Sequence, residues 1–117
     1  PEFGNYLPIP KKLYRLGVKD FVRITDSRMS GGAFGTVILH CAPESAAGGP
    51  LAAVRDGDMI EIDVDKNLLR LDVSDEELAA RLKAVVPKEH PDITRGFVRN
   101  FIDNVLQADE GCDMRYM

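Results

Sequence analysis

The run from Asp26 to Gly35 combines the groups that a catalytic turn requires. It contains a carboxylate, a guanidinium, two serine hydroxyls and three glycines, and β-like apolar stretches lie on both sides. Glycine permits positive φ and a close approach of backbone amides to a ligand. Such a turn can present an oxygen to a substrate and stabilise a developing anion. The same composition fits an ordinary glycine-rich connection between two strands, and physical chemistry alone favours that simpler interpretation.

Composition and charge narrow the class of protein. The 117 residues are enough for one small domain with a core, and 44% hydrophobic with 29% charged residues is ordinary for a soluble globular fold. The net charge of −4 argues against nucleic acid or an anionic membrane as a partner. No apolar run approaches the ~20 residues of a membrane span, and no signal-peptide pattern opens the chain. We therefore expect a cytoplasmic protein, and the initial Pro1 fits a segment of a longer one.

The two cysteines, Cys41 and Cys112, lack the spacing of a metal site. Cys41 lies in an apolar stretch and is expected in the core. A disulfide between them is possible, but two free thiols in a reducing cytoplasm are the favoured state.

The elements that must position the turn follow from local patterns. We expect an irregular lead-in over residues 1–10, a β-rich core over 11–73, a helical part over 74–106 and a tail over 107–117. In the core, the patterns predict a helix over 11–16, strands over 18–25, 36–41 and 51–54, a loop over 43–50 and a hairpin of 59–64 with 68–73. The strand over 36–41 reads as buried on both faces.

Capping and helical periodicity predict the rest of the chain. Ser74 and Glu77 form a capping-box pattern before a helix over 75–84, and a second helix is predicted over 93–106. Together these elements indicate a mixed α/β fold, a compact barrel-like β-sheet with flanking helices.

The segment Thr25–Gly32 resembles the signature of the dihydroxy-acid and sugar-acid dehydratases, the group that includes 6-phosphogluconate dehydratase. Stretches 1–5, 42–50 and 106–113 agree in order and spacing, so the resemblance covers nearly the whole chain. Arg28-Met29 and the last stretch are more similar to the sugar-acid branch, of the arabonate or xylonate type. Because such enzymes are several times longer, the chain resembles their C-terminal domain alone, a swivelling β/β/α domain.

The resemblance implies a reaction and a set of site residues. Loss of water from a 2,3-dihydroxy acid gives a 2-keto acid through an enol, with Ser30 as alkoxide base and Glu2 as a ligand of Mg²⁺. An iron–sulfur cluster would be held by cysteines outside this chain. Gly31 and Gly32 would offer backbone amides to the substrate or oxyanion.

The resemblance and the local sequence also suggest roles for further residues. The resemblance places Arg28, Thr25 and Asn104 near substrate, although a His is expected at the position of Asn104. Asp26 and Arg28 could instead pair and brace the turn. His40, within an apolar stretch, reads as a hydrogen-bonded core histidine rather than a catalyst. Glu44 matches the family stretch without an assigned chemical role.

The implied partners are an N-terminal α/β domain of the same protein, further copies in a homo-oligomer and a small sugar acid. The isolated chain should be inactive and should expose an apolar patch where the other domain would lie. The alternative is a non-catalytic β-rich domain for assembly or small-ligand binding. A phosphate-binding loop ranks last, because the turn lacks the Lys of a P-loop and the glycine spacing of a dinucleotide fingerprint.

Overall fold

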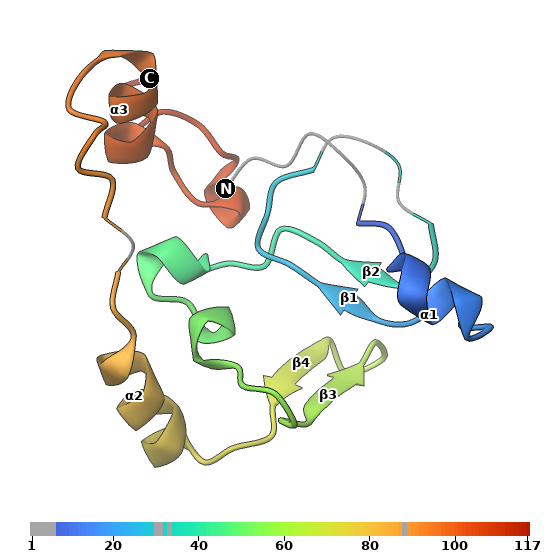
Figure 1. The fold of residues 1–117 in the computed structure, drawn as a ribbon. Helices are drawn as coiled ribbons and strands as arrows, with labels where there is room; N and C mark the ends of the chain where they lie inside the picture. Colours follow the sequence, from blue (N-terminus) through green and yellow to red (C-terminus); the bar gives the residue numbers. More distant parts are fainter. Residues whose placement is uncertain (1–6, 30–31, 33, 88) are drawn as a thin grey trace.

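The computed structural model describes residues 7–29, 32, 34–87 and 89–117. The α-helices are α1 (Lys11–Arg15), α2 (Asp75–Ala84) and α3 (Gly96–Asn104), and the strands are β1 (Arg23–Ile24), β2 (Val37–Ile38), β3 (Ile60–Asp63) and β4 (Leu68–Leu71) (Figure 1). Short 3₁₀ helices are η1 (Ser45–Ala47), η2 (Pro50–Ala53) and η3 (Ala108–Glu110). Within the described residues the strands form two separate two-stranded sheets and no closed barrel. The swivelling β/β/α architecture stays a prediction.

Strands β1 and β2 flank the glycine-rich turn and pair in parallel, Arg23 with Val37 and Ile24 with Ile38. Both are shorter than predicted. The Asp20 carboxylate accepts hydrogen bonds from the backbone N–H groups of Phe21 and Thr36, and so diverts both chain segments from a longer ladder. Val37 and Ile38 are half-buried, so the prediction of a strand buried on both faces is wrong.

The antiparallel hairpin of β3 and β4 lies where alternation predicted it, with Ile60 opposite Leu71 and Asp63 opposite Leu68. Asn67 adopts a φ of 52° in the connecting turn, a conformation that Asn tolerates better than most residues. The predicted strand over 51–54 is wrong, because this segment forms η2. Pro50 fixes the first φ of a helical turn, and the following Leu-Ala-Ala has no β-branched residue.

The helices follow their predicted signals closely. Helix α2 has the predicted bounds, and the Ser74 hydroxyl accepts a hydrogen bond from the Glu77 N–H at 3.2 Å. The Glu77 carboxylate accepts from Arg81 Nε at 2.7 Å, four residues on. Helix α3 begins at Gly96, three residues later than predicted, because Arg95 is still extended.

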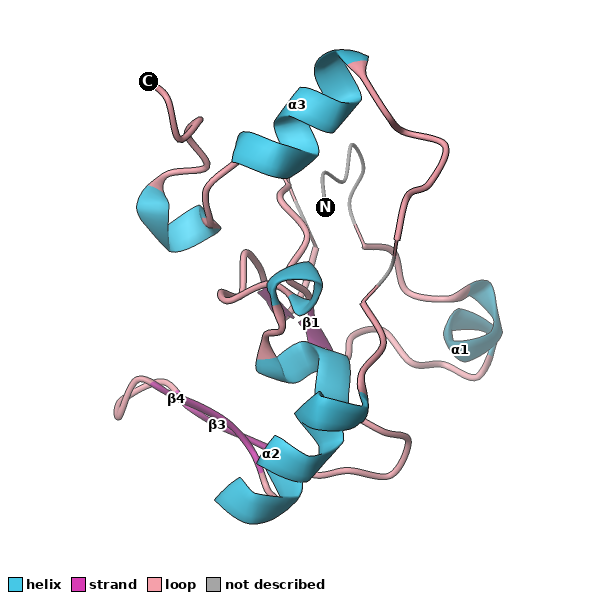
Figure 2. Cartoon of the chain, turned by 90° about the vertical axis from the view of Figure 1, so that its left-hand side faces the viewer, coloured by secondary structure: helices cyan, strands magenta, loops and turns pink. Residues whose placement is uncertain are grey.

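The chain is loosely packed for its length. Its radius of gyration is 16.3 Å, whereas a compact domain of this size has about 13 Å. No described side chain is fully buried, and Met29 and Ala53 are the most buried apolar ones. Helices α2 and α3 lie apart (Figures 1 and 2). Large apolar side chains are exposed on α3 and before it, including Phe97 (78%) and Val86 (86%).

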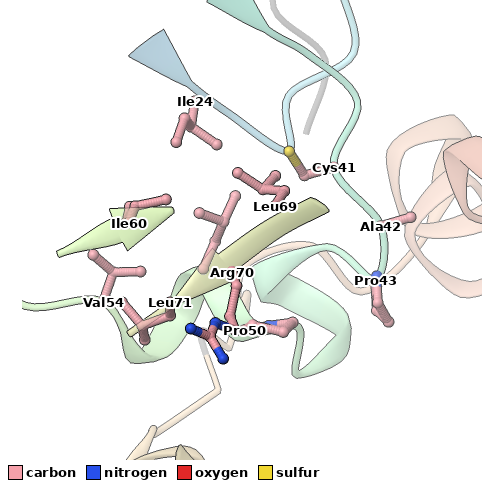
Figure 3. Close-up of a pocket in the computed structure, with 11 residues that line it drawn as sticks. Ile24, Cys41, Ala42, Pro43, Pro50, Val54, Ile60, Leu69, Arg70 and Leu71 are labelled. Carbon is pink, nitrogen blue, oxygen red and sulfur yellow. The ribbon is translucent and has the colours of Figure 1, made fainter. Parts of the chain in front are cut away.

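A cavity of about 140 Å³ lies between the two sheets. Ile24 and Cys41 line it from the β1–β2 side, and Ile60 and Leu69 line it from the hairpin (Figure 3). Burial raises the pKa of the Cys41 thiol. Cys41 is half-buried and Cys112 is exposed, and both are free thiols as predicted.

A substitution at Gly49 tests how tightly the loop that precedes η2 is packed. A Cβ at this position would lie 1.7 Å from the Pro43 carbonyl oxygen, which belongs to the backbone and cannot rotate away. Gly49→Ala should therefore lower the free energy of unfolding by about 2–3 kcal/mol in urea titrations. Gly48→Ala is the matched control, since its Cβ would meet no atom and only its φ of 82° is unfavourable. That control should lose about 1 kcal/mol, and equal losses would contradict the steric explanation.

Candidate functional site

The residues predicted to form the site are only partly described. Glu2, Ser30 and Gly31 lie outside the described residues. Thr25, Arg28, Gly32 and Asn104 are described. So are residues 25–29, which lead into the turn (the entering arm), and residues 34–36, which lead out of it (the leaving arm). The geometry of those arms decides how the turn is held.

The entering arm is fixed by a buried ion pair between Arg28 and Glu44. Arg28 Nε and Nη2 donate to Glu44 Oε1 at 2.9 and 2.7 Å, and the two side chains are 6% and 4% exposed. Arg28 Nη2 also donates to the Leu106 carbonyl oxygen at 2.6 Å. The Arg28 guanidinium thus joins the turn to the loop over residues 43–50 (the second loop) and to the residues that follow α3 (the C-terminal segment).

The second loop is held from two further sides. Gln107 Oε1 accepts a hydrogen bond from the Glu44 N–H at 2.8 Å, and Asp26 Oδ2 accepts one from the Ser45 N–H at 2.6 Å. Asp26 and Arg28 therefore brace the turn against residues 44 and 45, and the pairing of these two side chains with each other stays a prediction. The sequence did not predict the role of Glu44. The available signal was that this acidic residue lies in a stretch that matches the family but has no assigned chemical role.

Two opposing effects act on the pKa of the Asp26 carboxyl. Desolvation by burial works to raise the pKa of its carboxyl, but hydrogen bonds, chiefly those from Ser45, contribute to holding the pKa below its ordinary value. The carboxylate form of Asp26 is therefore the one that the folded loop stabilises.

The leaving arm is fixed by Asp20 and Arg23. Asp20 Oδ2 accepts hydrogen bonds from the N–H and the hydroxyl of Thr36 at 3.0 and 3.2 Å. The Arg23 guanidinium, almost fully buried, donates to the carbonyl oxygens of Leu7 and Phe34. Gly35 fits between them with a φ of 80°, and a Cβ there would lie 2.1 Å from Asp20 Oδ1.

His40 contacts Met29, the residue of the entering arm that precedes Ser30 in the sequence. The Met29 N–H lies 3.0 Å from His40 Nε2. His40 is hydrogen-bonded, as predicted, but it is exposed rather than a core residue. Its φ of 55° turns the chain away from β2.

Of the remaining described candidates, Thr25 and Asn104 form hydrogen bonds within their own segments. Thr25 Oγ1 accepts a hydrogen bond from the Ser27 N–H at 3.0 Å. Asn104 Nδ2 donates to the Asn100 carbonyl oxygen at 2.9 Å, one turn back in α3. Gly32 is exposed. The structure brings Arg28 to the C-terminal segment just after Asn104, through Leu106.

The described residues do not supply a metal or cluster site. Within residues 7–29, 32, 34–87 and 89–117, no three His, Cys, Asp or Glu side chains gather in an arrangement that could hold a metal ion. The same described part of the chain contains no helix that is long and apolar enough to span a membrane.

Glu44→Gln should lower the free energy of unfolding by about 3–5 kcal/mol, because it removes the carboxylate charge that binds the buried Arg28 guanidinium. Urea titration monitored by circular dichroism measures the loss. The control is Glu61→Gln, which breaks the exposed pair with Arg70 and should lose less than about 1 kcal/mol.

A double variant keeps this test decisive if Glu44→Gln does not fold. Arg28→Met with Glu44→Leu removes both charges together and should recover at least half of the loss. Equal effects of Glu44→Gln and Glu61→Gln would contradict the view that the buried pair holds the turn.

Asp26 should contribute to acid sensitivity. Because its pKa is lower in the folded chain, its stabilising effect is complete above the unfolded value of about 3.9 and is lost as the pH falls through the folded pKa. Asp26→Asn should therefore flatten the dependence of the unfolding free energy on pH below about pH 5. Urea titrations from pH 7 to pH 2 measure this slope, and an unchanged slope would contradict the assigned cause.

Comparison with known proteins supplies the family. The family model described as "Dihydroxy-acid/6-phosphogluconate dehydratase C-terminal" matches residues 1–112. An L-arabonate dehydratase of Azospirillum brasilense is 55% identical over 121 residues, covering 99% of this chain and 21% of that protein. A 6-deoxy-6-sulfo-D-gluconate dehydratase of Pseudomonas putida is 51% identical, covering 100% of this chain and 20% of that protein.

A dihydroxy-acid dehydratase of Desulfatibacillum aliphaticivorans is 45% identical over 92 residues, covering 79% of this chain and 16% of that protein. The chain thus spans about a fifth of the length of the curated relatives it matches. The resemblance seen in the turn motif and the three further stretches is confirmed: the chain belongs to the dihydroxy-acid/6-phosphogluconate dehydratase C-terminal family.

Proposed function

We propose that this chain is the C-terminal domain of a hydro-lyase that dehydrates a 2,3-dihydroxy sugar acid to a 2-keto-3-deoxy acid. Relatives that match nearly the whole chain are named for sugar acids, L-arabonate and 6-deoxy-6-sulfo-D-gluconate among them. The named dihydroxy-acid dehydratase matches a smaller share, which favours the sugar-acid branch for this chain.

One observation of the structure carries the proposal: the arm that precedes Ser30 is held by buried, charge-assisted hydrogen bonds. The Arg28–Glu44 pair and the bond from Arg28 to Leu106 fix this arm to two other segments. A catalytic group needs such support, because its geometry must be held within about 0.5 Å of the productive one. A plain connection between two strands needs no buried ion pair.

In the proposed reaction the Ser30 alkoxide takes the proton from C2 of the substrate while the C3–O bond breaks. The proton then passes from Ser30 to the leaving hydroxide, which forms water and restores the alkoxide. The resulting enol then becomes the 2-keto acid. A serine oxygen acts as a base only when donors stabilise its anion, and the amides of Gly31 and Gly32 are our candidates. Thr25 and Asn104 stay candidates for substrate contact, each after giving up its present local bond.

Arg28 takes a different role from the one that the resemblance suggested. Its guanidinium binds the Glu44 carboxylate at 2.7 Å in a nearly solvent-free setting, so its charge is largely neutralised by its partner. We therefore propose Arg28 as the brace of the turn rather than as a ligand of the substrate.

We propose that an iron–sulfur cluster and Mg²⁺ are bound by residues that lie outside the described part of this chain. Because the described residues offer no metal site, an iron–sulfur cluster and most ligands of Mg²⁺ would come from another part of the protein. Glu2, outside the described residues, is the proposed magnesium ligand of this chain. Carboxylate oxygens are the ligands that this cation prefers.

We also propose an N-terminal α/β domain and a homo-oligomer as partners, in the cytoplasm. The open packing supports this, since exposed side chains such as Phe97 and Val86 would be covered by a neighbouring surface. The proposal also accounts for the small core and predicts that the chain alone is inactive.

Ser30→Ala in the full-length protein tests the reaction. The protein is reconstituted with iron, sulfide and Mg²⁺ without oxygen, and 2-keto acid is assayed with a panel of aldonic acids and 2,3-dihydroxyisovalerate. Loss of the base should lower kcat by at least about 100-fold, while the melting temperature stays unchanged. Ser27→Ala, which removes the neighbouring hydroxyl of the same turn, is the matched control.

Two results would count against the proposal. Equal turnover in Ser30→Ala and Ser27→Ala would remove Ser30 as the base. No turnover by the loaded wild-type protein on any acid would favour the alternative, a non-catalytic domain for assembly or small-ligand binding.

A further inference from the structure

We propose that His40 is a positioning residue of the site: its imidazole holds the Met29 peptide, which immediately precedes Ser30 in the sequence. The inference rests on the proposed function, because it assigns a role in presenting the proposed base. It concerns a residue that the sequence predicted to be a structural core histidine.

The contact between His40 and Met29 runs through one ring nitrogen, and its direction is assigned from the burial of Met29. His40 Nε2 lies 3.0 Å from the Met29 nitrogen and 3.1 Å from the Met29 carbonyl oxygen. Met29 is only 7% exposed, so water has little access to its N–H. A buried N–H without a partner is rare in native structures. The lone pair of Nε2 therefore accepts from Met29, and the ring proton is assigned to Nδ1.

The backbone of His40 is arranged for this contact. Its φ of 55° lies in the left-handed region, which residues other than glycine seldom adopt. The next residue, Cys41, returns to the pair of strands by donating its N–H to the Thr25 carbonyl oxygen at 3.2 Å. The chain thus bends at one residue between β2 and this bond. Uncommon backbone conformations of this kind persist where the surrounding structure requires them.

The place of the contact along the chain indicates positioning rather than general stability. The bonds of Asp26 and Arg28 already fix the arm to the second loop. The His40 bond is the last one in the described part of the entering arm, and Ser30 is the next residue. Among the described residues this exposed side chain hydrogen-bonds to Met29, so it adds little to the core but restrains the Met29 peptide.

The test compares His40→Asn with His40→Gln in the full-length protein, loaded as for the Ser30 experiment. Asn tolerates the positive φ but its amide is too short to replace Nε2. Gln carries a side-chain carbonyl oxygen about as far from the backbone as Nε2. The matched control is His90→Gln, at the other histidine of the sequence.

We expect His40→Asn to lower kcat by about 10- to 100-fold, the cost of a misplaced reacting group, with KM within about twofold of wild type. Hydrogen exchange followed by mass spectrometry should be faster in the peptide that contains the Met29 amide. His40→Gln should restore both the protection and most of kcat. His90→Gln should change neither.

The inference is overturned if His40→Asn keeps wild-type kcat, if exchange at Met29 stays slow in that variant, or if His40→Gln does not restore turnover. A wild-type protein without turnover would instead be a failure of the proposed function. The exchange measurement then still decides whether the His40 bond holds the Met29 peptide.

Discussion

The buried pair of Arg28 and Glu44 is the constraint on which the rest of the site depends. Removing two charges from water costs several kcal/mol per ion, and only close contact with further hydrogen bonds offsets that cost. Leu106 supplies its carbonyl oxygen to the guanidinium, and Gln107 binds the backbone beside the carboxylate. The motif turn, the second loop and the C-terminal segment are therefore stable only together.

The elements that sequence reasoning predicted well are those that local patterns determine. The hairpin follows from alternating residues around a turn at Asn67, and α2 follows from the Ser74 cap. The segment after Pro50 was misassigned because four mainly apolar residues without a partner strand fit a 3₁₀ turn as well as a strand. The length of β1 and β2 depends on Asp20, whose carboxylate reaches a residue 16 positions away.

The motif of the candidate site could be recognised from the sequence, but the contacts that hold it could not, and the roles of Ser30 and Glu2 stay predictions. Ser30 and Glu2 were identified by resemblance, and physical chemistry alone favoured a plain connection at that turn. Glu44 could not be assigned from the sequence, because its partner Arg28 is 16 residues away and its second support, Gln107, is 63 residues away. His40 was placed in the core because its neighbours are apolar, whereas its positive φ turns the ring toward Met29.

The bond from Arg28 to Leu106 spans 78 residues, and this separation has a consequence for the order of folding. Contacts distant in sequence form late, because the entropy of closing the intervening chain must be offset first. The hairpin and α2 need only their neighbours and can form early. On the ribosome, the entering arm of the turn cannot acquire its complete set of bonds until the segment after α3 has left the exit tunnel. The geometry of the site is therefore completed only after Leu106 has been made, 78 residues later than Arg28 of the motif.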